Sequence, residues 1–392
     1  MSTRRAVLRR MGVGALVTTG VTLAGASPSG AAVASAGDEI LLDSCSGTDD
    51  QKLTAALAAA KASTPRRPIR LAARSHTFSL TRTTFSGLRI LGPNIGWQNP
   101  EIGGSNGALP QCTVTLNCGS GASAWLVGTA TTYDVTVAGI CFLSSNGVTQ
   151  FYHPPFSAGT SYTTRLDTLT FFGFKHVLGT PADPFSATLN TWAGDWTLVG
   201  VQDTQFSLRG SDNWFVPSSM NYGWAGDNGG KYLMRFSNVA KSSVKHLYLT
   251  ARGGSRGVLV EGTASQQGGL AFSDCVIEGQ NAGDPAMGAL IVVKGGGVSF
   301  TNTKLNFGMA RPSDFTDQQD TALVMVTGGV CLLTHTWVNR ATATAESVPV
   351  VAVSGGQAHV STLMGMGGNW TGKPKTTRTG GVLVADSTVT AA

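Results

Sequence analysis

The sequence predicts an all-β chain that folds as a solenoid, a parallel β-helix of about 10–12 coils with a capping helix at its N-terminal end. Three observations lead to this prediction. Short segments rich in Val, Thr, Leu and Phe alternate with Gly and polar turns along most of the chain. A valine-rich segment recurs roughly every 30 residues in the C-terminal half. The composition, with 51 glycines and only 13% charged residues, suits many turns and excludes a long coiled coil.

The first 36 residues are expected to be an export signal that lies outside the fold. Arginines concentrated in residues 4–10 precede an apolar run over residues 11–24, and the small residues 34–36 supply a cleavage site. The paired arginines resemble the twin-arginine motif. We therefore expect a secreted protein, exported by the twin-arginine route. Its mature chain, residues 37–392, would be a single β-helix domain with no membrane association after removal of the signal.

Removal of this segment also changes the charge of the chain. The full sequence has 28 Lys and Arg against 22 Asp and Glu. Residues 1–36 contain four arginines and no acids, so 24 basic and 22 acidic residues remain, a net charge of +2. A balanced chain without a basic stripe does not predict a nucleic-acid partner.

One helix is predicted, over residues 49–62. Asp49 or Asp50 can cap its start, and Pro65 follows its end. Its apolar stripe consists of Leu53, Ala56, Leu57 and Ala60. Because the ends of a solenoid expose strand edges, we expect this helix to cover the first coil.

Repeated strand sequences define the coils in the C-terminal half. Aligned valines fall at Val260, Val293, Val326, Val353 and Val384. Second strands lie between them, at residues 270–272, 298–300 and 330–333. Two or three short strands per repeat without an intervening helix indicate stacked coils. A β-propeller would need a longer period of about 40–50 residues.

The stretch over residues 46–60, followed by Gly-punctuated coils, resembles the pectin-lyase-like right-handed parallel β-helix proteins. This superfamily contains polysaccharide lyases, glycoside hydrolases and tailspike depolymerases. The resemblance implies a right-handed coil, a carbohydrate ligand and, because trimers recur in the superfamily, a homotrimer. It covers about residues 40–390 and does not select one chemistry.

Two shorter stretches resemble inulin fructotransferases, which share this fold. They are residues 96–99, Gly-Trp-Gln-Asn, and residues 223–229, Gly-Trp-Ala-Gly-Asp-Asn-Gly. The resemblance implies that Asp227 is catalytic. The second acid of that family, a Glu shortly downstream, has no counterpart here, because residues 238–240 are Asn, Val and Ala.

Residues 190–227 contain the main candidate site. The aromatic residues expected to bind substrate are Trp192, Trp196, Trp214, Tyr222 and Trp224, and the acids interleaved with them are Asp195, Asp203, Asp212 and Asp227. Aromatic faces with polar edges suit sugar rings. Glycosidic cleavage needs two carboxyl groups about 5–10 Å apart, which neighbouring coils can provide. We therefore expect a carboxylate pair that cleaves a polysaccharide or oligosaccharide, with Asp227 as the first candidate. Any one of these acids could instead form a turn.

Two other functions stay open. A polysaccharide lyase would act by β-elimination on an acidic polymer, with Lys245 and Arg252 as its basic residues. Ca²⁺ could then serve as a cofactor, whereas the other functions require no cofactor or metal. A non-catalytic glycan-binding or tailspike-like protein is the third alternative.

The six cysteines allow disulfides in an exported protein, and Cys112 and Cys118 are the nearest pair in the sequence. Buried free thiols inside strands are the alternative.

Overall fold

The structure is a computed structural model. It describes residues 35–93, 112–118, 124–128, 130–144, 150–153, 160–182, 184–188, 191–201, 204–215, 221–225, 232–251, 256–263, 269–279, 289–306, 322–339, 349–366 and 373–391. Residues 33–392 form the larger of the two units of the chain. The predicted export signal lies outside the described residues except for its last two, which form β1 (Ser35–Ala36). Strand β1 pairs antiparallel with β2 (Glu39–Leu41).

Two sheets build the larger unit, and apart from β1–β2 the described strands pair in parallel. The longer sheet contains, within the described residues, 20 strands. After β1 and β2 these are β3 (Ile69–Arg70), β4 (Ser75–Phe78), β6 (Arg89–Leu91), β7 (Thr113–Leu116), β10 (Thr136–Ser144), β13 (Arg165–Phe172), β16 (Thr191–Val201), β18 (Asn213–Phe215), β19 (Asn221–Ala225), β21 (Ser242–Lys245), β22 (Leu247–Ala251), β24 (Leu270–Ser273), β25 (Val276–Gly279), β27 (Gly297–Thr301), β28 (Lys304–Asn306), β30 (Val330–Asn339), β32 (Gln357–Met366) and β34 (Val382–Ala385).

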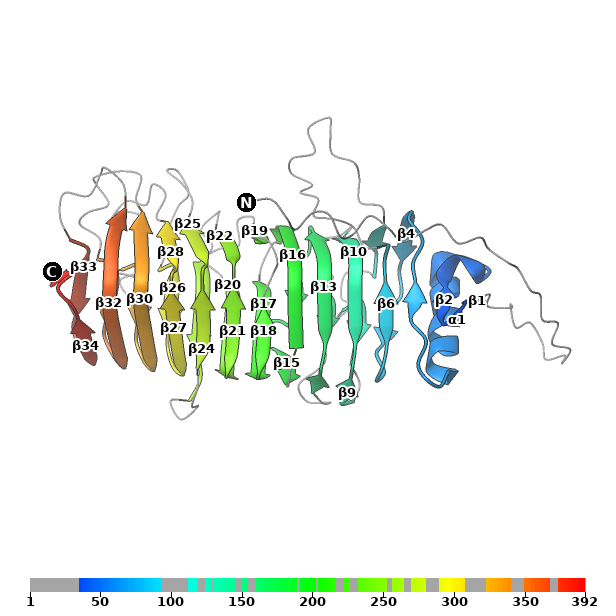
Figure 1. The fold of residues 1–392 in the computed structure, drawn as a ribbon, viewed down its shortest axis with the longest axis horizontal. Coiled ribbons are helices and arrows are strands. Elements are labelled where there is room, and N and C mark those ends of the chain that lie inside the picture. Colours follow the sequence, from blue (N-terminus) through cyan, green and yellow to red (C-terminus); the bar gives the residue numbers. More distant parts are fainter. Residues whose placement is uncertain are drawn as a thin grey trace, which may run out of the picture. The chain divides into compact units, whose positions relative to one another are not determined.

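The shorter sheet contains 15 strands in the described part of the chain. They are β5 (Arg82–Thr83), β8 (Leu126–Val127), β9 (Thr132–Tyr133), β11 (Gln150–His153), β12 (Ser161–Tyr162), β14 (His176–Leu178), β15 (Phe185–Thr188), β17 (Thr204–Ser211), β20 (Tyr232–Ala240), β23 (Arg256–Glu261), β26 (Ile291–Val293), β29 (Val324–Val326), β31 (Val351–Val353), β33 (Lys375–Arg378) and β35 (Thr390–Ala391). Each coil therefore contributes strands to both sheets, and Figure 1 shows the coils following one another in chain order from β6 to β34. The predicted parallel β-helix is confirmed.

The predicted valine column is confirmed for four of its five members. Val260 pairs with Val293, Val293 with Val326 and Val326 with Val353, all in the shorter sheet. The fifth assignment is wrong. Arg378 of β33 continues the column after Val353, whereas Val384 pairs with His359 in the longer sheet. In the shorter sheet the last coil contributes the polar strand β33. The final valine-rich segment, β34, belongs to the longer sheet.

Helix α1 (Asp49–Ala62) covers the first coil, as predicted, but Thr48 is its N-cap. Thr48 Oγ1 accepts from Gln51 N at 3.4 Å, and Gln51 Oε1 accepts from Thr48 N at 2.8 Å, which completes a capping box. The aspartates instead fasten the helix to the coil. Asp50 accepts hydrogen bonds from Ser79 N at 2.9 Å and from Arg82 Nη2 at 2.8 Å. The buried side of the helix carries Leu53, Ala56 and Ala60.

Left-handed residues mark two corners of the coils. At the first, before strands of the longer sheet, stand Asp134, Thr163, Asp212 and Lys241, with φ between +46° and +57°. The second lies within the longer sheet and is called here the kink. Its left-handed residues are Gly139, Thr168, His246, Asp274, Asn302, His335 and Thr362. At the kink the alternation of inward and outward side chains slips by one residue. Leu166 before Thr168 is buried, and after Thr168 the buried positions are Leu169 and Phe171.

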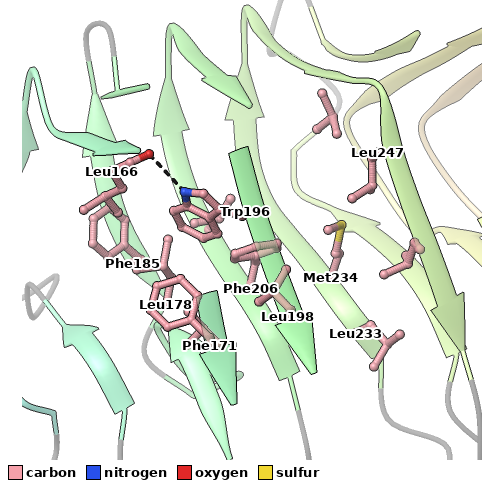
Figure 2. Packing of buried hydrophobic residues seen from close by; sticks show 14 of the residues in the cluster. Leu166, Phe171, Leu178, Phe185, Trp196, Leu198, Phe206, Leu233, Met234 and Leu247 are labelled. Atoms are coloured by element: carbon pink, nitrogen blue, oxygen red, sulfur yellow. Dashed lines mark hydrogen bonds between the residues drawn. The ribbon is translucent and has the colours of Figure 1, made fainter. Parts of the chain in front are cut away.

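Aromatic rings from neighbouring coils pack against one another in the interior. Phe171 lies 5.2 Å from Trp196, and Trp196 lies 5.3 Å from Phe206, measured between ring centroids. Figure 2 shows these rings among the buried leucines of neighbouring coils. This packing forms a continuous hydrophobic core between the two sheets.

All six cysteines are free thiols, which agrees with the second alternative, and no disulfide joins Cys112 to Cys118. Burial raises the pKa of Cys112, Cys141, Cys275 and Cys331 to about 12. These thiols act as small apolar side chains of the core. Among the described residues, no helix is long and apolar enough to span a membrane.

Candidate functional site

The structure describes only part of the candidate site predicted from the sequence. Asp203, Asp227 and Arg252 lie outside the described residues. Asp195, Trp192, Trp214, Tyr222 and Trp224 lie in described strands, so their register positions are known. Trp196, Asp212 and Lys245 are described with their side chains. Lys245 is exposed on β21, level with Ser273 of the next coil.

Trp196 belongs to the core, which corrects its assignment to a sugar-binding surface. Its side chain is 2% exposed, and its indole Nε1 donates a hydrogen bond to Leu166 O at 2.9 Å (Figure 2). The kink explains the error. Trp192 and Trp196 are four residues apart and would share one side of a regular strand. Trp196, however, pairs with buried Leu169, beyond the slip at Thr168.

Asp212 occupies a coil corner. Its φ of +57° lies in the left-handed region, which Asp tolerates better than most residues, and its N–H donates to Ala240 O at 3.1 Å. Asp134 and Thr163 take the same place on earlier coils. The turn role left open for these acids therefore explains Asp212 without a catalytic function.

The register brings the predicted aromatic residues into two rows across the longer sheet. The first row consists of Arg89, Thr136, Arg165, Trp192 and Trp214, each paired with the next. The second row consists of Trp224, Thr250, Glu278, Asn306 and Asn339. Tyr222 stands two residues before Trp224 and pairs with Tyr248. Residues scattered over 190–224 thus share one sheet with polar residues that sequence reasoning did not connect to them.

A hydrogen-bonded carboxylate lies on the second row. The Tyr248 hydroxyl donates to Glu278 Oε2 in a short contact, and Asn306 Nδ2 donates to Glu278 Oε1 at 2.7 Å. Asn339 Nδ2 donates onward to Asn306 Oδ1 at 3.4 Å. We call Tyr248, Glu278, Asn306 and Asn339 the Glu278 cluster. All four side chains are half-buried, so the hydrogen-bonded cluster still reaches solvent.

The Glu278 cluster can bind and position a sugar. Its two donors fix both oxygens of the carboxylate, while remaining lone pairs can accept hydrogen bonds from hydroxyl groups. A fixed carboxyl group can also exchange a proton with a leaving oxygen or a water. Sequence reasoning missed Glu278, because a single Glu in a strand is unremarkable and its partners lie 28 and 30 residues away. The sequence Val276-Ile277-Glu278 gives no clear alternation, and only the structure shows that Ile277 is buried while Glu278 is half-buried.

The potential metal ligands found among the described residues are Asp43, Asp49 and His76. Basic side chains of the protein already form salt bridges with these carboxylates. Arg74 contacts both aspartates, at 2.7 Å from Asp49 Oδ1, and Lys52 Nζ lies 3.1 Å from Asp43 Oδ1. The hydrogen bond from Arg74 holds the pKa of Asp43 well below its usual range. This group serves as an ion-pair network that ties α1 to the first coil.

Comparison with known proteins bears on the fold. No protein-family model matches the sequence, and a search of curated proteins finds no significant match. Solved structures do match. DFA-IIIase from Arthrobacter chlorophenolicus A6 in complex with GF2 has a TM-score of 0.59 at 12% identity, over 87% of this chain and 90% of that one. The A-module of mannuronan C-5 epimerase AlgE4 from Azotobacter vinelandii has a TM-score of 0.54 at 12% identity, over 88% and 94%.

A third structure, the catalytic domain of Agl-KA, has a TM-score of 0.51 at 11% identity, over 93% of this chain and 70% of that one. The chain therefore shares its parallel β-helix fold with these structures. The resemblance predicted from the sequence is thereby confirmed for the architecture. At these identities it concerns the fold alone and does not select a chemistry.

Proposed function

We propose that this protein is an exported carbohydrate-active enzyme that binds a polysaccharide along the longer sheet and cleaves a glycosidic bond beside Glu278. The Glu278 cluster is the observation that carries the proposal. It places a half-buried carboxylate, fixed by Tyr248 and Asn306, in the same row as Trp224. A positioned carboxyl group next to aromatic residues is what glycosidic cleavage and sugar binding require.

The second carboxyl group would be Asp227. This acid follows three residues after Trp224, which stands two coils from Glu278. Glycosidases use two carboxyl groups about 5–10 Å apart, and the proposal requires Asp227 to come within that range of Glu278. In this scheme one carboxyl group protonates the leaving oxygen, and the other acts as base or nucleophile.

The names of the fold neighbours support a carbohydrate substrate. They include a mannuronan C-5 epimerase, and two further matching structures are DFA-IIIase bound to DFA-III. Secretion by the twin-arginine route and assembly as a homotrimer are parts of the same proposal.

A lyase remains a second candidate function because Lys245 is exposed on the same sheet. One experiment separates the candidates. The purified full-length protein is incubated with a broad panel of polysaccharides, and both reducing ends and absorbance at 232 nm are recorded. We expect new reducing ends without absorbance. Unsaturated products absorbing at 232 nm would instead identify a lyase, and tight binding of a glycan without any product would identify a non-catalytic protein.

A further inference from the structure

A hollow lies on the longer sheet, away from the Glu278 cluster. It has a volume of about 760 Å³ and is formed by β3, β6, β10 and β13 with the corners beside them. This volume lies within the range of about 300–1,000 Å³ that is typical of ligand sites. Arg89, Thr136 and Arg165, the N-terminal members of the first row, line it. We call it the arginine groove.

The floor of the arginine groove is built from small residues whose backbones touch. Gly92 and Ala138 belong to it, and a Cβ at Gly92 would lie only 2.0 Å from Gly139 O on the adjacent coil. A side chain therefore cannot fill this place without moving the backbone. The groove is a fixed feature of the coil packing, with polar groups at its rim.

The three arginines at the rim have different roles. Arg70 donates to both oxygens of Glu39, at 2.6 and 3.0 Å, and also to Gly92 O at 2.8 Å, so it is neutralised and structural. Arg165 Nη2 donates to Asp167 Oδ2 at 2.9 Å, but its side chain is 62% exposed. Exposed pairs of this kind contribute little and exchange partners readily. Arg89 is exposed and forms no ion pair or side-chain hydrogen bond with any residue that the structure describes.

Register places Arg89 and Arg165 on either side of one hydroxyl group. Thr136 pairs with Arg89 on the preceding coil and with Arg165 on the following one. The two arginine Cα atoms are therefore about 10 Å apart, and their long side chains can both lean over Thr136. Two guanidinium groups within reach of one hydroxyl group form a donor set suited to a carboxylate or a sulfate.

The acids at the rim limit what can bind. Asp134 accepts a hydrogen bond from Thr163 Oγ1 at 2.7 Å, and Asp167 faces Arg165. Together with Glu39 these carboxylates balance the three arginines, so the groove has no net excess of positive charge. A bare anion gains little from such a rim. A sugar unit that carries one acidic group can satisfy both kinds of group at the rim. Its hydroxyl groups can donate hydrogen bonds to the aspartates, while its acidic group binds Arg89.

We propose that the arginine groove is a subsite for an acidic sugar unit, whose carboxylate or sulfate ester is held by Arg89 and Arg165 above Thr136. This inference rests on the proposed function, since the rest of the same polysaccharide would run along the sheet toward the Glu278 cluster. That cluster lies four coils beyond β13, about 19 Å away. The substrate is therefore a glycan with acidic units, and the groove sets its specificity at a distance from the cleaved bond.

The test measures binding of defined probes to the full-length protein by calorimetry. The probes are a uronic-acid hexasaccharide, its carboxyl-reduced neutral counterpart, a sulfated hexasaccharide and inorganic sulfate. The variants are Arg89→Gln and the double variant Arg89→Gln/Arg165→Gln. Arg378→Gln, an exposed arginine on the shorter sheet, is the matched control. Thermal unfolding of each variant checks that its fold is intact.

We expect Arg89→Gln to weaken binding of one acidic hexasaccharide at least tenfold. The double variant should bind the acidic and neutral hexasaccharides equally well. Arg378→Gln should leave the affinity for every probe unchanged. The uronate and sulfate probes show which acidic group is recognised. Equal weakening of acidic and neutral probes, or no weakening, overturns the proposal. So does inorganic sulfate that binds as tightly as the sulfated hexasaccharide. Arg89-dependent binding of an acidic probe without cleavage of any glycan would keep the subsite and refute the proposed enzymatic function alone.

Discussion

Two glycines at the same corner of consecutive coils provide a matched test of how the coils stack. Gly296 and Gly329 have nearly the same left-handed backbone, with φ of +72° and +69°. Their surroundings differ. A Cβ on Gly296 meets nothing within 4 Å, whereas a Cβ on Gly329 would lie 2.3 Å from Gly296 O and 2.7 Å from Gly295 C. Substitution by alanine therefore imposes the same backbone strain at both positions and a steric clash at only one.

The magnitudes follow from these two effects. Left-handed backbone costs a non-glycine residue about 1–2 kcal/mol, so Gly296→Ala should lower the free energy of unfolding by about that amount. Overpacking adds about 1–3 kcal/mol, because the clashing atoms belong to backbone and cannot rotate away. Gly329→Ala should thus cost about 2–5 kcal/mol. With an unfolding entropy of roughly 0.75 kcal/mol per kelvin for about 360 residues, the expected drops in Tm are about 1–3 °C and about 3–7 °C.

The assay is thermal unfolding followed by circular dichroism, with wild type and both variants heated at one scan rate. Equal shifts for the two variants would refute the close backbone stacking of this corner. A larger shift for Gly296→Ala than for Gly329→Ala would also refute it.

Three further predictions concern stability and reactivity. Trp196→Ala should destabilise the protein by about 3–5 kcal/mol in denaturant unfolding, because it opens a cavity and leaves Leu166 O without its donor. Tyr133→Ala, at a side chain 52% exposed, should cost less than about 1 kcal/mol, and similar costs would contradict the core position of Trp196. Asp43 has a lowered pKa in the folded state, so its stabilising effect should be complete above about pH 5 and lost as the pH falls further. The Tm difference between wild type and Asp43→Asn should therefore shrink on acidification. A Tm difference that does not change with pH would contradict this prediction. Cys331 should resist a thiol reagent at pH 8 until the protein unfolds, and rapid labelling of the native protein would contradict its burial.

The sequence predicted the architecture because hydrophobic repeats follow directly from stacking. Val260, Val293 and Val326 pair as their spacing predicts, since each fills the same inward place on successive coils. Val384 was misplaced because a valine-rich segment alone does not reveal to which sheet its strand belongs. The N-cap was assigned to Asp49 or Asp50, one or two residues too late, since Thr48 and Gln51 form the capping box while the aspartates bind the first coil.

The candidate site was less predictable, for two physical reasons. Trp196 turned inward because the kink shifts the alternation by one residue, and the left-handed position that causes the shift has no fixed residue type: Gly139, Thr168 and His246 all take it. Glu278 was missed because its partners come from neighbouring coils, so only the register shows that Tyr248 and Asn306 meet it. Loop lengths that vary between coils hide such register from a sequence read alone.

The most direct test of the proposed function is the cleavage rate of Glu278→Gln on the best substrate from the polysaccharide panel. Glu261→Gln is the matched control, because Glu261 is a half-buried carboxylate that accepts from Arg235 and Ser237 on the shorter sheet. We predict that Glu278→Gln loses at least about 100-fold in kcat while still binding substrate, and that Glu261→Gln keeps its activity. Full activity in Glu278→Gln would contradict a catalytic role for the Glu278 cluster.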